Sequence, residues 1–264
     1  MRDLVALIAA SGALLQSGIV SAQVGQYPFA FTREEQVLGI IQAGVASFKG
    51  IPYASAPIGS LRWRPPQPAP QSSAIRTASE YAPACQQPSI AGPGSYRTSE
   101  DCLALNIFKP FEVENPLPVM IWIHGGSFIA GSASDPLVDG SKLAQAGVVV
   151  ITLNYRLGAF GWLAHPALAE GPSNSPVANY GMMDPIAALR WVHENIRAFG
   201  GDPSNVTLFG TSSGVASVAL LMLCEQSREL FQKAILESVP GREPVRSMET
   251  ADAVGKQFSP SDWV

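Results

Sequence analysis

The sequence predicts an α/β fold in which helices flank a largely parallel β-sheet, and three observations predict it. Short apolar stretches alternate with helix-like segments along most of the 264-residue chain, an order typical of strands joined by crossover helices. Three of these stretches, 118–125, 147–156 and 205–210, are apolar nearly throughout, as strands covered on both faces are. In 184–199, apolar residues recur at helical spacing and predict an amphipathic helix that covers the sheet.

The remaining elements follow from the same patterns. The apolar face of the 184–199 helix consists of Leu189, Val192, Ile196 and Phe199. Further strands are expected at 44–51, 103–109 and 233–238, and further helices at 140–146, 213–223 and 249–258. Residues 52–99 are rich in Pro, Ser and Ala and long for a connection, so we expect an irregular surface excursion there.

The composition excludes several classes of protein. Hydrophobic residues make up 47% of the chain and charged residues 14%, whereas disordered chains combine low hydrophobicity with high charge. The formal net charge is −4 and no Lys/Arg run occurs, which argues against a nucleic-acid partner held by phosphate contacts. No metal-ligand spacing such as C-x-x-C or H-E-x-x-H is present, so neither a metal site nor a cofactor is expected.

The first 22 residues have the features of a secretory signal peptide. Arg2 provides a short basic region, residues 4–20 are mostly apolar, and small residues precede Gln23, as signal peptidase requires. A membrane anchor is the alternative, but Gln16 and two glycines interrupt the stretch, and a spanning helix needs ~20 strongly apolar residues. We therefore expect cleavage before Gln23 and a secreted mature chain, residues 23–264, without a membrane span.

The chain contains three cysteines, Cys85, Cys102 and Cys224. Export permits disulfides. Cys85 and Cys102 flank a loop rich in Gly, Pro and Ser, and a bridge between them would pin this loop and stabilise the fold by roughly 3 kcal/mol. Cys224 ends an apolar helix-like stretch, and we expect it to be a buried free thiol.

The first candidate for chemistry is Gly210-Thr211-Ser212-Ser213-Gly214, a G-x-S-x-G sequence between a predicted strand and a predicted helix. In such a turn the glycines avoid clashes, and backbone strain presents the serine Oγ at the carboxyl edge of the sheet. The N–H of Ser213 would lie at a helix N-terminus, where it could donate to a developing oxyanion. An ordinary turn with Ser212 as the helix cap is the alternative that this pattern alone leaves open.

The second candidate is the segment 122–128, which follows the predicted strand 118–125. Its adjacent glycines, Gly125 and Gly126, would let backbone N–H groups point into a cavity, as an oxyanion hole requires. His124 could serve as a base, but a histidine that opens such a loop more often forms a local hydrogen bond. We expect His124 to hold the shape of the loop.

With both elements in place, the sequence resembles the type-B carboxylesterase/cholinesterase family of α/β-hydrolases. The resemblance runs from about residue 36 to 240, and the matching blocks are 48–68, 99–106, 124–128, 154–163 and 179–214. It implies an α/β-hydrolase fold in which residues 23–264 form the N-terminal portion of the domain.

The resemblance also implies roles for single residues. Ser212 would be the nucleophile, and the backbone N–H groups of Gly126, Ser127 and Ser213 would form the oxyanion hole. Cys85 and Cys102 would form a disulfide, in agreement with the loop argument above. The expected partner is a small-molecule carboxylic ester.

Several positions depart from the family pattern. Thr211 replaces a glutamate, Ser213 an alanine, Ser127 the third oxyanion glycine, Pro185 a glutamine and Ala104 an aromatic residue. Backbone N–H donors remain at Ser127 and Ser213, so these changes do not exclude the oxyanion hole, but a Cβ at Ser127 would narrow the room for an acyl group.

No histidine follows the nucleophile. The triad order in α/β-hydrolases is Ser…Asp/Glu…His, yet residues 213–264 contain no histidine, and His165 and His193 precede Ser212, as His124 does. We expect His193 on a helix surface and His165 in a local turn. The family's acid and histidine lie in a C-terminal half that we expect this chain to lack, which would leave the strand 233–238 as an open edge of the sheet.

Two functions are compatible with these observations. The first is a carboxylic ester hydrolase in a truncated form with little or no activity, because the triad is incomplete. The alternative is a non-catalytic, cholinesterase-like binding or adhesion domain. The sequence does not predict the oligomeric state.

Overall fold

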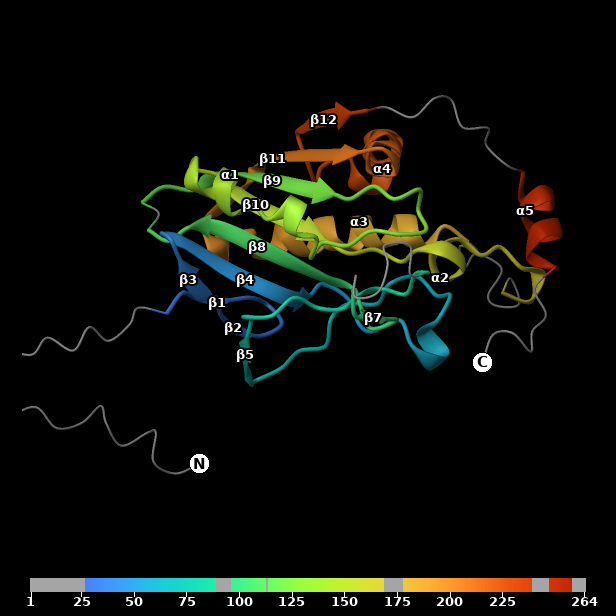
Figure 1. Ribbon diagram of the computed structural model, residues 1–264, viewed down its shortest axis with the longest axis horizontal. Helices are drawn as coiled ribbons and strands as arrows, with labels where there is room; N and C mark the ends of the chain where they lie inside the picture. The colour runs from blue at the N-terminus through green and yellow to red at the C-terminus, as the bar shows by residue number, and fades with distance from the viewer. Residues whose placement is uncertain (1–26, 89–95, 113, 169–177, 239–246, 258–264) are drawn as a thin grey trace, which may run out of the picture.

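A seven-stranded β-sheet forms the centre of the molecule, in the strand order β12-β11-β9-β10-β8-β4-β3 (Figure 1). The computed structural model describes residues 27–88, 96–112, 114–168, 178–238 and 247–257. The strands of the main sheet are β3 (Ile40–Gln42), β4 (Val45–Pro52), β8 (Ala104–Pro110), β9 (Leu117–Ile123), β10 (Val149–Leu153), β11 (Gly201–Thr211) and β12 (Lys233–Glu237).

Short strands and helices surround this sheet. The short strands are β1 (Phe29–Phe31), β2 (Gln36–Leu38), β5 (Ile75–Thr77), β6 (Ala84–Cys85) and β7 (Thr98–Ser99). The α-helices are α1 (Ser141–Gln145), α2 (Gly158–Trp162), α3 (Tyr180–Asn195), α4 (Ser213–Leu223) and α5 (Met248–Gly255). The 3₁₀ helices are η1 (Gly59–Leu61), η2 (Pro136–Val138), η3 (Pro166–Leu168), η4 (Ile196–Phe199) and η5 (Glu225–Ser227).

Each predicted strand and helix is present, with ends displaced by a few residues, and the α/β class is confirmed. The sheet is mixed rather than largely parallel. β12, β11, β9 and β10 run parallel to one another, whereas β8, β4 and β3 join through antiparallel pairs. The antiparallel part begins with a tight hairpin at Ala43 and Gly44, which both have positive φ; such turns connect antiparallel strands. The expected parallel arrangement therefore applies to the half of the sheet that leads to Ser212.

The core lies on the sheet face that α3 and α4 cover. Val119, Ile121 and Leu208 from the strands are fully buried there. The predicted apolar face of the long helix is confirmed, because Leu189, Val192, Ile196 and Phe199 are all at most 2% exposed. On the opposite face of β9 and β11, alternate residues are half-buried.

Residues 52–99 contain only short strands and one 3₁₀ turn among their described positions, as expected for an irregular excursion. The predicted signal peptide, residues 1–22, lies outside the described residues. Within the described ranges, none of the helices has the length and apolar character needed to cross a bilayer.

Candidate active site

Ser212 lies between the end of β11 and the beginning of α4. Its backbone has φ 54° and ψ −125°, a conformation that costs a non-glycine residue about 1–3 kcal/mol. The side chain is exposed and makes no capping hydrogen bond to the helix. Ser212 is therefore not an ordinary helix cap, and its strained backbone has the form expected of a nucleophile elbow.

Steric contacts explain both glycines of the motif. A Cβ at Gly210 would lie 2.8 Å from the carbonyl oxygen of Ile123, and a Cβ at Gly214 would lie 2.1 Å from the same oxygen. Both distances are far below van der Waals contact. The elbow can thus pack against the end of β9 only because these two positions have no side chain.

The loop after β9 lies directly beside the elbow. A Cβ at Gly125 would lie 2.8 Å from the carbonyl oxygen of Thr211, so this loop packs on the residue before Ser212. Gly126 has φ +110°, and its carbonyl oxygen accepts hydrogen bonds from the N–H groups of Ile129 and Ala130, both at 3.0 Å. These bonds close a compact turn.

The predicted oxyanion donors gather at this junction. Ser213 is the first residue of α4, where an N–H group has no partner within the helix. The N–H groups of Gly126 and Ser127 donate to no acceptor in the part of the chain that the structure describes. Ser127 has φ 54°, the left-handed conformation that glycine adopts without strain. The loop that carries Gly126 and Ser127 also lies against the elbow, since a Cβ at Gly125 would be 3.2 Å from the Cβ of Ser212.

His124 is a structural residue of the loop, as expected. Its Nδ1 lies 2.8 Å from the carbonyl oxygen of Gly125, and its ring stacks on Tyr155 with centroids 4.3 Å apart. The Tyr155 hydroxyl in turn donates to the His124 carbonyl oxygen at 2.8 Å. Burial lowers the pKa of His124 to about 4, so the imidazole is neutral at pH 7. The imidazole is held by its contacts with Gly125 and Tyr155, so it is not available as a base for Ser212.

The predicted positions of the other two histidines, His165 and His193, are confirmed. His193 is exposed on α3, and the Nδ1 of His165 accepts a hydrogen bond from the N–H of Ala167 at 3.1 Å in a local turn. No hydrogen bond joins the Ser212 hydroxyl to a histidine or carboxylate within the described ranges. The structure thus brings the loop of Gly126 and Ser127 against Ser212 and Ser213, and their roles as oxyanion donors and nucleophile stay predictions.

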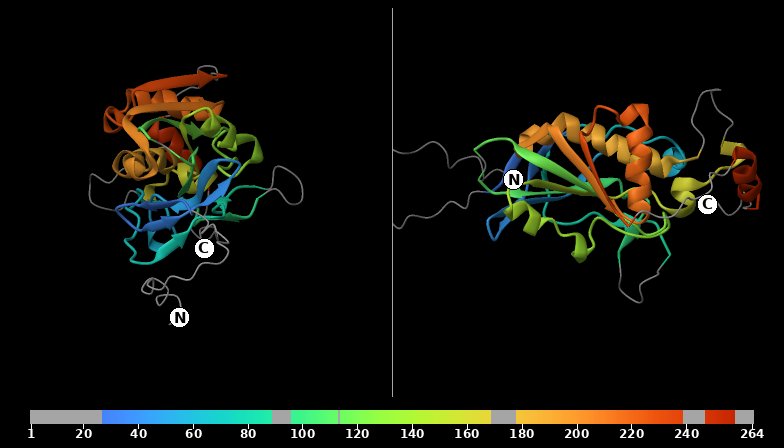
Figure 2. Two further views of the ribbon diagram at one scale, coloured as in Figure 1. Left: turned by 90° about the vertical axis from the view of Figure 1, so that its left-hand side faces the viewer. Right: turned by 90° about the horizontal axis from the view of Figure 1, so that it is seen from above.

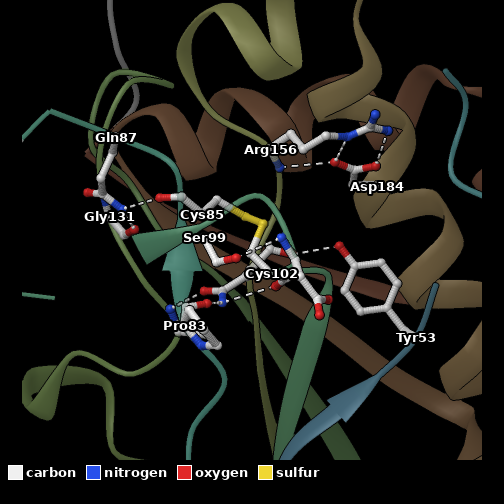
Figure 3. Close-up of a disulfide and its surroundings, with 12 residues drawn as sticks. Tyr53, Pro83, Cys85, Gln87, Ser99, Cys102, Gly131, Arg156 and Asp184 are labelled. Atoms are coloured by element: carbon white, nitrogen blue, oxygen red, sulfur yellow. Dashed lines mark hydrogen bonds and ion pairs between the residues drawn. A yellow bond between two sulfur atoms is a disulfide. The ribbon is translucent and has the colours of Figure 1, made fainter. Parts of the chain in front are cut away.

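Figure 3 shows a buried ion pair, between Arg156 and Asp184, that the sequence analysis did not predict. Arg156 donates to the Asp184 carboxylate from Nε at 2.8 Å, from an amino group at 2.6 Å and from its backbone N–H at 3.0 Å. Both side chains are at most 3% exposed. The pair fixes α3 to the segment after β10, and two residues on, the N–H of Gly158 donates to the Phe128 carbonyl oxygen at 2.8 Å. The only sequence signal was that both residues lie in blocks that resemble the family.

The predicted disulfide between Cys85 and Cys102 is present, with the two Cα atoms 5.0 Å apart (Figure 3). Its loop is tied to the site by Gln87, whose amide group donates to the carbonyl oxygen of Gly131 at 2.8 Å and accepts from its N–H at 2.9 Å. Cys224 is a free thiol as expected, but it is half-buried rather than buried, because it lies at the end of α4.

A groove of about 430 Å³ lies between Phe48, Lys109 and Phe199. Ser212 is exposed and is not among the residues that line this groove. Within the described ranges, no three His, Cys, Asp or Glu side chains are grouped to hold a metal ion.

Comparison with known proteins decides the family. Residues 26–260 match the carboxylesterase family. The chain belongs to this family. Among its relatives, fumonisin B1 esterase of Sphingopyxis macrogoltabida is 45% identical over 221 residues, which are 83% of this chain and 41% of that protein. Para-nitrobenzyl esterase of Bacillus subtilis is 48% identical over 216 residues, which are 80% of this chain and 43% of that protein.

Solved structures show the same relationship. A thermophilic PNB esterase superposes on this chain with a TM-score of 0.80 at 44% identity, and the match covers 86% of this chain and 47% of that structure. A carboxylesterase of Geobacillus stearothermophilus gives a TM-score of 0.79 at 43% identity, with 87% and 48% covered. The α/β-hydrolase fold is thus confirmed, and the chain spans less than half the length of these relatives.

Proposed function

We propose that this chain carries the nucleophile and the oxyanion hole of a carboxylic ester hydrolase. The observation that carries the proposal is the strained backbone of Ser212, an exposed residue at an elbow against which the loop at Gly125 packs. Membership of the carboxylesterase family supports the same chemistry, and two of the curated relatives are named as esterases.

The reaction would be acyl transfer in two steps. The Ser212 oxygen attacks the ester carbonyl carbon, and the N–H groups of Gly126, Ser127 and Ser213 stabilise the negative charge that develops on the carbonyl oxygen. The alcohol leaves with the proton that the serine gave up, and water then attacks the acyl group on Ser212 to release the acid. Both steps need a base that takes a proton and returns it.

The 264-residue chain is proposed to have little activity, because residues 213–264 contain no histidine. Loss of the triad histidine alone can cost about 10⁶ in kcat. We place the acid and the histidine of the triad outside residues 1–264. The substrate is proposed to be a small carboxylic ester, and the Cβ of Ser127, which stands where the family has glycine, favours a small acyl group.

We further propose that the protein is secreted. The signal-peptide pattern of residues 1–22 supports this location. A disulfide such as Cys85–Cys102 fits it as well, because disulfides persist in oxidising compartments.

Hydrolysis of p-nitrophenyl acetate tests the proposal in two forms of the protein. The 264-residue chain should show almost no rate that depends on Ser212. A chimera in which residues 27–238 are joined to the matching C-terminal part of Bacillus subtilis para-nitrobenzyl esterase should hydrolyse the ester. Ser212→Ala should abolish that activity, and Ser204→Ala, at an exposed serine of β11, should preserve it.

Two outcomes would contradict the proposal. One is an ordinary esterase rate in the 264-residue chain that disappears with Ser212→Ala, which would mean that a base is present. The other is a folded chimera whose activity does not change with Ser212→Ala. A protein partner that binds the native chain and the Ser212→Ala variant equally well would favour the binding or adhesion domain.

A further inference from the structure

The side-chain amide of Gln87 is held at three points (Figure 3). Its nitrogen donates to the carbonyl oxygen of Cys85 at 3.0 Å and to that of Gly131 at 2.8 Å, and its oxygen accepts from the N–H of Gly131 at 2.9 Å. Both N–H donors of the amide are therefore used. Because two of the three bonds reach the donor and the acceptor of one residue, the amide fixes both the position and the orientation of the Gly131 backbone.

Gly131 directly follows the turn that carries two of the proposed oxyanion donors. The carbonyl oxygen of Gly126 accepts from the N–H of Ala130 at 3.0 Å, which closes the turn. Gly131 has φ +118°, and a Cβ there would lie 2.3 Å from Nδ1 of His124, so the chain leaves the turn in close contact with this ring. Gly126 and Ser127 are themselves exposed. Burial therefore does not hold these two residues, and their position depends on the bonds that hold the turn.

The disulfide gives Gln87 a fixed base. Cys85, two residues before Gln87, is bonded to Cys102, and both cysteines are 2% exposed. The side-chain amide of Asn154 donates to the carbonyl oxygens of Pro83 at 2.9 Å and Cys102 at 3.2 Å, so the backbone is held near both cysteines. The right view of Figure 2 shows the teal segments around β6 and β7 beside the green loop that follows β9.

Two backbone groups of the same loop are held elsewhere. The carbonyl oxygen of Phe128 accepts from the N–H of Gly158 at 2.8 Å, and the N–H of Ala133 donates to the side-chain oxygen of Asn154 at 2.8 Å. Without the amide of Gln87 the loop would stay attached at these two points, but the stretch between them would lose its tether. Loss of the amide is thus expected to loosen the turn without detaching the loop.

We propose that Gln87 is a positioning residue for the ester hydrolysis proposed above. Its amide transfers the fixed position of the disulfide to Gly131 and, through the turn, to the N–H groups of Gly126 and Ser127. Gln87 acts only through this backbone and takes no part in bond making. The inference rests on the proposed function, because it concerns a turn whose N–H groups are proposed to bind the oxyanion.

Hydrogen exchange in the 264-residue chain tests whether Gln87 holds the turn, and it needs no ester. Gln87→Ala should speed exchange of the N–H groups of Ile129, Ala130 and Gly131 about tenfold, as measured by NMR. Gln87→Glu keeps the length of the side chain but has no N–H donor, so it should speed exchange at Ile129 and Ala130 as well. Gln86→Ala changes the neighbouring glutamine, which is exposed, and should leave the exchange unchanged. Unchanged exchange in β9 and β10 shows that the fold of each variant is intact.

Kinetics of the chimera with para-nitrobenzyl esterase test the effect on the reaction. Because the negative charge on the carbonyl oxygen develops in the transition state, a displaced turn should weaken transition-state binding more than substrate binding. Gln87→Ala and Gln87→Glu should therefore lower kcat for p-nitrophenyl acetate about tenfold and change KM little. Gln86→Ala should change neither constant.

A double-mutant cycle tests the role of the disulfide. Cys85→Ser/Cys102→Ser should lower kcat as Gln87→Ala does. Gln87→Ala should have little further effect in that background, because both changes break the same connection. Cys224→Ser, at the free thiol, is the matched control and should leave kcat unchanged.

Three outcomes would overturn the proposal. One is a folded chain in which neither Gln87 variant speeds exchange at Ile129 and Ala130. Another is an active chimera in which Gln87→Ala changes KM and not kcat. The third is a loss of kcat from Gln87→Ala that adds in full to the loss from the two cysteine substitutions. A chimera without Ser212-dependent activity would contradict the proposed function alone, and the exchange of the turn would still decide whether Gln87 holds it.

Discussion

At the scale of single residues, Ser127 and Ser212 share an unusual property. Both have φ 54°, and both lie in the turns that bring the oxyanion loop and the elbow together. Left-handed backbone costs an ordinary residue about 1–2 kcal/mol. The close contacts of Gly125 and Gly214 with the neighbouring backbone show how the surrounding structure holds these turns in place. Backbone strain is thus present in both turns where the chemistry is proposed to occur.

His124 makes the stability of the fold depend on pH. Its pKa is lowered by burial to about 4, below the ~6.5 of an unfolded histidine, and its buried Nε2 has no partner among the described residues. Between these two values the unfolded state binds more protons than the folded state, so stability decreases as the pH falls. We expect the free energy of unfolding to drop by about 2 kcal/mol from pH 7 to pH 5 through this residue.

Urea denaturation at the two pH values measures this effect. His124→Asn should remove this part of the pH dependence, whereas His193→Gln, at an exposed position on α3, should not. Equal pH dependence in the native chain and in His124→Asn would contradict the prediction.

At the scale of elements, the ion pair between Arg156 and Asp184 holds α3 against the segment after β10. Removal of one partner leaves a buried charge without compensation, which costs about 3–5 kcal/mol. We therefore expect Asp184→Ala to lower the free energy of unfolding by about that amount, as measured by urea denaturation.

An exposed pair provides the comparison. Arg33 and Glu194 lie 3.1 Å apart, but their side chains are 64% and 42% exposed, and solvent screening reduces such pairs to about 0–1 kcal/mol. Glu194→Ala should thus have little effect. If Asp184→Ala and Glu194→Ala lower the free energy of unfolding by the same amount, the buried pair does not anchor α3.

At the scale of the whole molecule, the disulfide connects an irregular excursion to the main sheet. Cys85 and Cys102 close a loop with a sequence separation of 17, and the side chain of Gln87 joins this loop to the backbone of Gly131. Loss of the disulfide raises the conformational entropy of the unfolded chain and should lower the free energy of unfolding by about 3 kcal/mol. Thermal or urea denaturation of Cys85→Ser/Cys102→Ser measures the loss.

Cys224→Ser is the control, because that thiol is free and half-buried. It should leave stability nearly unchanged, and added reductant should destabilise the native chain but not the double variant. A double variant as stable as Cys224→Ser would show that the bridge contributes nothing to the fold.

The sequence by itself determined the features that depend on local pattern. Apolar runs and helical periodicity predicted the strands and helices, because burial imposes that pattern on neighbouring residues. Gly210 and Gly214 predicted the elbow, because the close approach of backbone to the end of β9 excludes side chains there. Absence of histidine after Ser212 is likewise a property of the sequence alone.

The tertiary structure decided what depends on residues far apart in the chain. The sequence pattern of a buried apolar strand is the same in a parallel and in an antiparallel sheet. The mixed topology is therefore evident only from the strand pairing in the structure. Arg156 and Asp184 are 28 positions apart, and no local pattern links them; the fold buries both charges together because each compensates the other. Trp122, Phe209 and Ile235 are neighbours only because three strands that are far apart in the sequence pair with one another in the sheet.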